Sequence, residues 1–358
     1  MRRAITGGRG ENRPYRPSEQ TNDMTTHTPI IEADHLSKQF WVADRKQGRF
    51  AGLRTIASRA GHWTGGVSDI SFAIQPGEVV GYIGPNGAGK STTIKMLTGI
   101  LVPTSGEATV AGITPWAHRK ELARRIGVVF GQRTQLWWDL PLADSLELLQ
   151  HMYRVPADRF AKNLTTAREL LDLDPFMQTP VRQLSLGQRM RGDLAAALLH
   201  SPPILYLDEP TIGLDIVAKT RIREFLAELN REEGVTILLT THDLADIERL
   251  CSRIIVIDDG RILYDGPLTA LKERFGTERQ LIVDYEDAPA NTALPDATPS
   301  IRVVSQEGPR VRFAFDRHVL SATQVLARAD TLGTVRDMAI EEPAIEDVIR
   351  QLYEGKAA

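Results

Sequence analysis

The chain has 358 residues, of which 42% are hydrophobic and 25% are charged, and these ordinary values exclude a disordered or fibrous protein. The formal net charge of -3 gives no overall attraction to nucleic acid, so nucleic acid is not an expected partner. The single cysteine, Cys251, excludes an internal disulfide, and the longest apolar runs fall short of the ~20 residues that span a bilayer.

Alternating strand and helix patterns occupy most of the chain. Residues 1–29 are polar and lack apolar periodicity, which predicts a disordered N-terminal tail. From residue 30 to 275, short β-rich runs alternate with helix-length segments, as in an α/β domain with a largely parallel sheet. The buried strands expected there are Val79 to Ile83, Ile126 to Phe130, Ile204 to Leu207, Thr236 to Leu239 and Ile254 to Ile257.

Two segments interrupt this alternation. Between about residues 134 and 200 helical patterns dominate, as in Asp144 to Tyr153 and Ala157 to Leu173, which predicts a helical subdomain. Residues 44–66 form a basic insertion, in which apolar residues recur at helical spacing between arginines. That pattern is typical of an amphipathic helix on an anionic membrane or partner surface, and equally of a solvated surface helix.

The composition changes again after Gly276. Asp287 to Pro299 is rich in Ala, Pro, Thr and Asp, as in a linker or loop, and strand-like runs follow at Ile301 to Val304 and Val311 to Phe315. We therefore expect a small α+β accessory domain over residues 276–358.

A glycine-rich loop follows the first buried strand. Its sequence, GPNGAGKST, satisfies the G-x-x-x-x-G-K-[ST] pattern, which chance produces in roughly one chain in a hundred of this length. The glycines let backbone N–H groups surround phosphates, Lys90 is expected to reach the β- and γ-phosphates of ATP, and Ser91 to bind Mg²⁺. The nucleotide-binding residues expected here are Gly84, Pro85, Asn86, Gly87, Ala88, Gly89, Lys90, Ser91 and Thr92.

Two acidic residues, Asp208 and Glu209, end the strand Ile204 to Leu207. Ligands bind at the carboxyl ends of parallel strands, so Asp208 is expected to hold Mg²⁺ through its water shell and Glu209 to polarise an attacking water. An acidic turn that only caps a strand is the alternative, and the phosphate-binding loop in the same chain disfavours it.

A third motif, LSLGQ at Leu184 to Gln188, accompanies the phosphate-binding loop and the ILYLDEP strand. Together the three resemble the ABC ATPase family, over roughly residues 30–271. Further family positions follow in the family's order: Gln132 in VVFGQ, Asp215 in TIGLD and His242 in LTTHD. The resemblance implies a P-loop NTPase that hydrolyses ATP with Mg²⁺. It also implies that Gln132 and His242 are catalytic, that Gln132 is a further Mg²⁺ ligand and that Asp215 contacts nucleotide.

The resemblance further implies a head-to-tail dimer, as a homodimer or a heterodimer, with ATP between the subunits. Ser185, Gly187 and Gln188 would then bind the nucleotide of the partner subunit, next to a helix expected from Arg189 to Leu199. Leu186 replaces the family's usual glycine, and we expect altered affinity or turnover from its bulk. Phe40 is expected to stack on adenine, the alternative being simple packing of an early strand.

The resemblance also implies separately encoded membrane permease subunits as partners. The chain itself is then expected to be cytoplasmic and peripheral, reaching the membrane only indirectly. Trp137 and Trp138 occupy the region that meets the permease in this family, and one of them is expected at that interface. The alternative is that one or both pack under the helical subdomain. The stretches FGQRTQLWWDLP, SLGQRMR and EPTIGLD resemble the exporter branch of the family, including multidrug, viologen and anthracycline-type ATPases. The EEPAIEDVIRQLY ending also resembles that branch. A soluble ABC ATPase that remodels ribosomes or DNA is the alternative.

Overall fold

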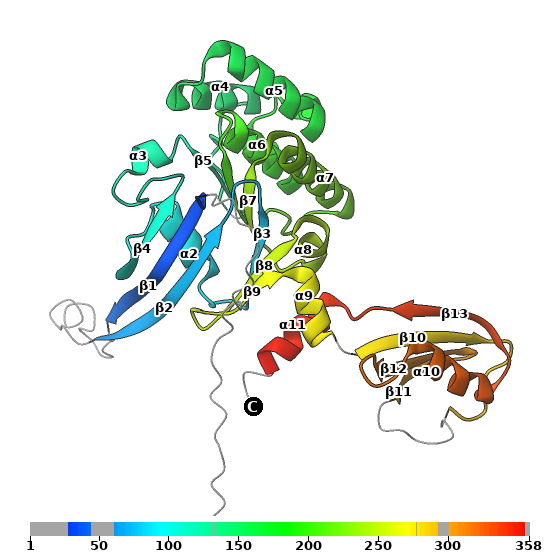
Figure 1. The fold of residues 1–358 in the computed structure, drawn as a ribbon. Helices are drawn as coiled ribbons and strands as arrows, with labels where there is room; N and C mark the ends of the chain where they lie inside the picture. Colours follow the sequence, from blue (N-terminus) through cyan, green and yellow to red (C-terminus); the bar gives the residue numbers. More distant parts are fainter. Residues whose placement is uncertain (1–27, 44–60, 132, 277, 293–300, 355–358) are drawn as a thin grey trace, which may run out of the picture. The chain divides into compact units, whose positions relative to one another are not determined.

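The computed structural model describes residues 28–43, 61–131, 133–276, 278–292 and 301–354. The chain divides into two units, Met1–Asp265 and Gly266–Ala358 (Figure 1). The boundary expected after residue 275 is therefore too late, because α9 (Leu268–Phe275) packs against α11 (Ile345–Glu354) in the second unit. Residues 1–27 of the expected N-terminal tail lie outside the described residues.

A six-stranded sheet forms the centre of the first unit, in the order β5-β6-β7-β3-β8-β9. The pairs from β5 to β8 are parallel, and their residues are largely buried, as expected for a sheet covered on both faces. All five buried strands expected from the sequence are present. The strands are β3 (Val79–Ile83), β5 (Ile126–Phe130), β6 (Ile204–Asp208), β7 (Thr236–Thr240), β8 (Arg253–Asp258) and β9 (Arg261–Pro267).

A second, antiparallel sheet has the order β2-β1-β4 and comprises β1 (Ile31–Ala43), β2 (Gly61–Ile74) and β4 (Ser105–Val110). Helix α2 (Lys90–Leu97) shares one buried apolar core with both sheets. Because β1 pairs with β2 as far as Ala43↔Gly61, residues 61–66 belong to a strand and not to the expected basic insertion. Residues 44–60, with the expected amphipathic segment, lie outside the described residues.

The expected helical subdomain contains α4 (Leu142–Tyr153), α5 (Ala157–Leu171), α6 (Leu186–Leu198) and two short 3-10 turns, Asp174–Phe176 and Val181–Gln183. Helix α6 begins earlier than expected, because the Ser185 side chain caps it. The other helices of this unit are α3 (Arg119–Leu122), α7 (Ile216–Glu233) and α8 (Leu244–Leu250). Within the described ranges, every helix is too short or too polar to span a lipid bilayer.

The second unit has its own core and is α+β, as expected. Its antiparallel sheet has the order β11-β12-β10-β13, and α10 (Ala322–Ala329) covers one face through buried Val325. The strands are β10 (Glu278–Tyr285), β11 (Ile301–Glu307), β12 (Arg310–Asp316) and β13 (Val335–Glu341). A 3-10 turn, Asp330–Leu332, follows α10.

Candidate functional site

The glycine-rich loop connects β3 to α2, and two of its glycines are required by close packing. A Cβ on Gly84 would lie 2.2 Å from the carbonyl oxygen of Ile257 in β8. Gly89, with a φ of +107°, precedes α2, and a Cβ there would lie 2.4 Å from the carbonyl oxygen of Gly66. The backbone therefore approaches its neighbours at distances that only glycine permits, and its wrapped path leads directly into the N-terminus of α2.

Lys90 is the first residue of α2 and is only 7% exposed. Its Nζ donates hydrogen bonds to the carbonyl oxygens of Gly84 at 2.6 Å and Pro85 at 3.1 Å. Burial lowers the pKa of Lys90, and the nearby carboxylates of Glu209 and Asp208 act in the opposite direction. The ammonium group is thus held inside the glycine-rich loop, where a phosphate would meet it.

Asp208 collects hydroxyl groups from two neighbouring elements. The Ser91 hydroxyl of α2 donates to Oδ2 at 3.0 Å, and the Thr240 hydroxyl at the end of β7 donates to Oδ1 at 2.6 Å. Oxygen donors of this kind suit Mg²⁺, which nucleotide-binding proteins hold through one or two carboxylates together with substrate phosphates. Ser91 and Asp208, the two Mg²⁺ ligands expected from the sequence, therefore lie side by side. The hydrogen bond from Thr240 to Asp208 was not predicted.

Glu209 lies beside Asp208 in a strained backbone conformation, with a φ of +60°. Its amide N–H donates to the carbonyl oxygen of Thr240 at 3.0 Å, and its Oε1 lies 2.9 Å from Nε2 of His242. Burial raises the pKa of Glu209, while His242 and Lys90 lower it. A partly buried carboxylate with a raised pKa is a better proton acceptor than an exposed one.

Gln132 lies outside the described residues, but the residue before it, Gly131, is placed against the two acids. The Gly131 amide donates to the carbonyl oxygen of Asp208 at 2.7 Å. A Cβ on Gly131 would lie 2.4 Å from the carbonyl oxygen of Glu209. The end of β5 is therefore packed on the Asp208–Glu209 segment, and the roles expected for Gln132 stay predictions.

Ser185 and Gln188 form a capping box at the start of α6. The Ser185 hydroxyl oxygen accepts from the Gln188 amide at 3.2 Å, and Gln188 Oε1 accepts from the Ser185 amide at 2.9 Å. The hydroxyl hydrogen of Ser185 is not used by this motif and can be donated to an anion. Asp215 has a similar structural part, since its Oδ1 accepts from the Ala218 amide at 2.8 Å and caps α7.

Leu186 lies over the TIGLD segment of its own chain. A Cβ on Gly213 would lie 2.9 Å from Cδ2 of Leu186, and one on Gly187 would lie 3.4 Å from Cβ of Ala218. We expected the bulk of Leu186 near a phosphate, and its contact with Gly213 of the same chain could not be predicted from the motif.

Phe40 lies on β1, is 37% exposed and covers Gly66 of β2. A Cβ on Gly66 would lie 2.7 Å from Cε2 of the Phe40 ring. Because the carbonyl of Gly66 packs on Gly89, this ring is placed near the glycine-rich loop, as adenine stacking would require. The next aromatic residue, Trp41, instead packs edge-on against Trp63 with ring centroids 5.2 Å apart.

Trp138 is 52% exposed, and Trp137 is half-buried. The guanidinium of Arg189, in the first turns of α6, lies 5.6 Å from the centre of the Trp138 ring. The Arg182 amide donates to the Trp138 carbonyl at 3.0 Å, and the Arg182 side chain pairs with Asp139 at 2.9 Å. The exposed ring is therefore connected to the segment that leads into Ser185.

Comparison with known proteins shows the family to which the chain belongs. The ABC transporter family model matches residues 67–212. ABC transporter ATP-binding protein NatA of Bacillus subtilis is 35% identical over 219 residues, which cover 61% of this chain and 87% of NatA. The chain belongs to the ABC transporter ATP-binding proteins. It is accordingly an ATP-binding subunit with ATPase activity, built on the P-loop NTPase fold that the sequence predicted.

Two further relatives add to this assignment. Nod factor export ATP-binding protein I of Ralstonia nicotianae is 38% identical over 239 residues, 67% of each chain. A solved dimeric ATP-binding cassette, in a post-hydrolysis state with ADP and phosphate, has a TM-score of 0.56 and 27% identity. That match covers 67% of this chain and 99% of the cassette. Nucleotide binding is thus a property of the matched cassette, and one relative is a dimer.

Proposed function

We propose that this ABC transporter ATP-binding protein powers export through separately encoded membrane permease subunits. The exporter name of the Ralstonia relative supports this direction of transport. The observation that carries the motor function is the 2.9 Å contact between Glu209 and His242, next to Lys90 and Asp208. A proton acceptor, its orienting partner and a phosphate-binding cation lie together there.

Each side chain of this site has a distinct part in ATP hydrolysis. Lys90 and the N–H groups of the glycine-rich loop bind the phosphates, and Ser91 and Asp208 hold Mg²⁺, which neutralises phosphate charge when bound. Glu209 accepts a hydrogen bond from the attacking water and takes its proton, while His242 holds the carboxylate in place. Gln132 is assigned to the water and Mg²⁺, and Phe40 to the adenine ring.

Turnover requires a head-to-tail dimer in this proposal. The capping box leaves the Ser185 hydroxyl hydrogen and the first N–H groups of α6 to the γ-phosphate bound by a partner subunit. Gly187 and Gln188 shape that helix start, and Asp215 caps the adjoining α7. The dimeric state of the solved cassette supports this arrangement.

The permease contact is assigned to Trp138, on the cytoplasmic side of the membrane. Its exposed ring offers an anchor of the kind that dominates protein interfaces. Its links to Arg182 and Arg189 would carry a displacement of the ring to the start of α6. Membrane association would then be indirect, through the permease alone.

The test of this function is recovery of the partner from membranes. A Glu209→Gln chain with an affinity tag, in the presence of ATP and Mg²⁺, is expected to retain a polytopic membrane protein through a high-salt wash. A Lys90→Ala chain is the matched control and should release that protein more readily, because it cannot form the ATP-bound dimer. Recovery of ribosomal particles or DNA in place of a membrane protein would support the soluble remodelling class and refute the proposal.

A further inference from the structure

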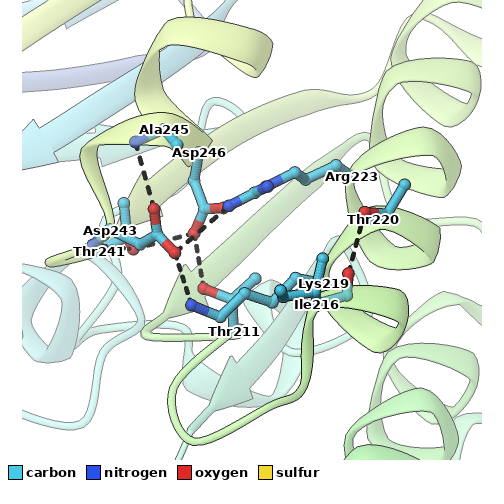
Figure 2. Close-up of polar contacts among 9 residues, drawn as sticks. All are labelled: Thr211, Ile216, Lys219, Thr220, Arg223, Thr241, Asp243, Ala245 and Asp246. Carbon is cyan, nitrogen blue, oxygen red and sulfur yellow. Dashed lines mark hydrogen bonds and ion pairs between the residues drawn. The ribbon is translucent and has the colours of Figure 1, made fainter.

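A buried carboxylate, Asp246 of α8, is held by side chains from α7 and from the segments that follow β6 and β7 (Figure 2). It is fully buried, and its Oδ2 accepts hydrogen bonds from the hydroxyls of Thr211 at 2.5 Å and Thr241 at 3.0 Å. The Arg223 guanidinium of α7 engages Oδ1 through Nε at 2.5 Å and also through Nη2. The charge is therefore neutralised and both oxygens are hydrogen-bonded, as a buried carboxylate requires.

Thr241 connects this carboxylate to His242, the next residue in the chain. Its hydroxyl donates to Asp246, and the same oxygen accepts from the Asp243 amide at 3.0 Å. A hydroxyl has one hydrogen, so the carboxylate fixes the direction of that hydrogen and leaves a lone pair for the amide. The turn that carries His242 is thus closed by a hydroxyl that Asp246 orients.

Thr211 connects the carboxylate to Glu209 in a similar way. Thr211 follows Glu209 by two residues, and the Ile212 amide donates to the Glu209 carbonyl at 3.3 Å. The Leu214 amide in turn donates to the Thr211 carbonyl at 3.3 Å, just before the α7 cap at Asp215. Asp246 therefore holds the chain segments of both members of the Glu209–His242 contact.

Helix α7 is attached to the same cluster by two cations. Lys219 donates to Oδ2 of Asp243 at 2.6 Å, and Arg223 lies 3.3 Å from that carboxylate as well as on Asp246. Figure 2 shows both cations extending from α7 toward the two carboxylates. The helix that begins at Asp215 is consequently fixed to the turn that carries His242.

We propose that Asp246 is a positioning residue for ATP hydrolysis, which sets the Glu209–His242 contact through the hydroxyls of Thr241 and Thr211. The inference rests on the proposed roles of Glu209 and His242. The contacts of Asp246 run to Thr211, Thr241 and Arg223, while Lys90 and Ser91 are assigned the phosphate and Mg²⁺ contacts. Loss of Asp246 should therefore reduce kcat and leave ATP affinity nearly unchanged.

Asp246→Asn tests this with little change in volume. Arg223 has no acceptor, so the amide oxygen must face it and the NH₂ group must face the two hydroxyls. That reverses the hydrogen bond to Thr241 and loosens the turn at His242. We expect kcat to fall by about 10- to 100-fold, the range in which small displacements of a catalytic group act, with ATP affinity within about twofold.

Thr241→Val and Thr241→Ser provide a second test that does not depend on the fold of the Asn variant. Valine has the shape of threonine without the hydroxyl, whereas serine keeps the hydroxyl. Turnover lost in Thr241→Val should be largely restored in Thr241→Ser, with unchanged binding of a fluorescent ATP analogue in both. Equal kcat in the two variants would overturn the proposal.

Asp265→Asn is the matched control. Asp265, on the edge strand β9 of the central sheet, holds Arg253 through two hydrogen bonds of 2.8 and 2.9 Å in the same unit. It should lower Tm and leave kcat of the folded fraction unchanged. If Asp246→Asn behaves in the same way, Asp246 is only structural. His242→Ala distinguishes failure of the proposed function from failure of the positioning role. Full turnover in His242→Ala refutes the catalytic role of His242. Lost turnover in His242→Ala together with full turnover in Asp246→Asn refutes only the positioning role of Asp246.

Discussion

Asp193 on α6 makes the stability of the first unit depend on pH. The residue is only 5% exposed, and its Oδ1 accepts hydrogen bonds from the Thr134 hydroxyl at 2.8 Å and the Gln135 amide at 3.1 Å. Burial raises the pKa of Asp193 from an ordinary 3.8 to about 6, against the opposing effect of these two donors. The Asp193 side chain therefore connects the segment after Gln132 to α6, and its ionised form lowers the free energy of unfolding because it is buried.

The sign of this effect follows from proton binding. The folded chain keeps the proton to a higher pH than the unfolded chain, so the favourable contribution is complete below pH 3.8 and is lost as pH rises through about 6. At ~1.4 kcal/mol per pH unit, the full difference is roughly 3 kcal/mol. Of the pKa difference between the folded and unfolded chains, about one unit falls between pH 5 and pH 6. The free energy of unfolding should therefore fall by ~1.4 kcal/mol between pH 5 and pH 8.

Urea unfolding of the natural chain and of Asp193→Asn measures this directly. The amide is neutral at every pH and keeps an oxygen for Thr134 and Gln135, so the difference between the two proteins isolates the carboxylate. The natural chain should lose stability relative to the variant as pH rises from 5 to 8. Asp144→Asn, an exposed carboxylate on α4, is the control and should give parallel curves. Parallel curves for Asp193→Asn as well would refute the reasoning.

Three further outcomes test the site and its partners. Lys90→Ala should abolish ATP binding, whereas Glu209→Gln should bind ATP and stop turnover, as equilibrium binding and phosphate release would show; equal loss of affinity in both would remove the role of Glu209. Ser185→Arg should be inactive alone but partly active when mixed with Lys90→Ala, because one composite site then stays intact; wild-type turnover of Ser185→Arg alone would exclude the trans site. Replacing Trp137 and Trp138 with Ala should release the chain from membranes, with an interface loss of ~2 kcal/mol or more and normal basal ATPase; an unfolded double variant, seen by circular dichroism, would show that they are core.

Most of the central sheet could be predicted because its strands other than the edge strand β9 are largely buried. Such strands appear in the sequence as short, continuous apolar runs, and β3, β5, β6, β7 and β8 all have this form. The strand β2 could not be recognised in the same way, because its first half is polar and pairs only with β1. The start of α6 was also missed, since a leucine and a glycine after Ser185 obscure the first turn until the capping hydrogen bonds are seen.

The phosphate-binding loop and the two acids at the end of β6 could be predicted because their chemistry depends on residues close in sequence. The polar support of the site depends on residues that are distant in sequence. Thr240 reaches Asp208, and Asp246 reaches Thr211, only because β6 and β7 are neighbours in the sheet. A threonine or aspartate in such a position has no sequence pattern that separates it from an ordinary helix cap or strand end.

Leu186 shows how the same limitation affects the meaning of a substitution. From the motif alone, a leucine in place of glycine adds bulk beside a phosphate. In the structure its side chain fills the space above Gly213, where a Cβ would lie 2.9 Å away. Gly213 has a φ of +69°, so glycine is favoured there both by the backbone and by the leucine that covers it. The Glu209 to Asp215 segment is thus held at Thr211 by Asp246 and at Gly213 by Leu186, and the leucine acts through packing within its own chain.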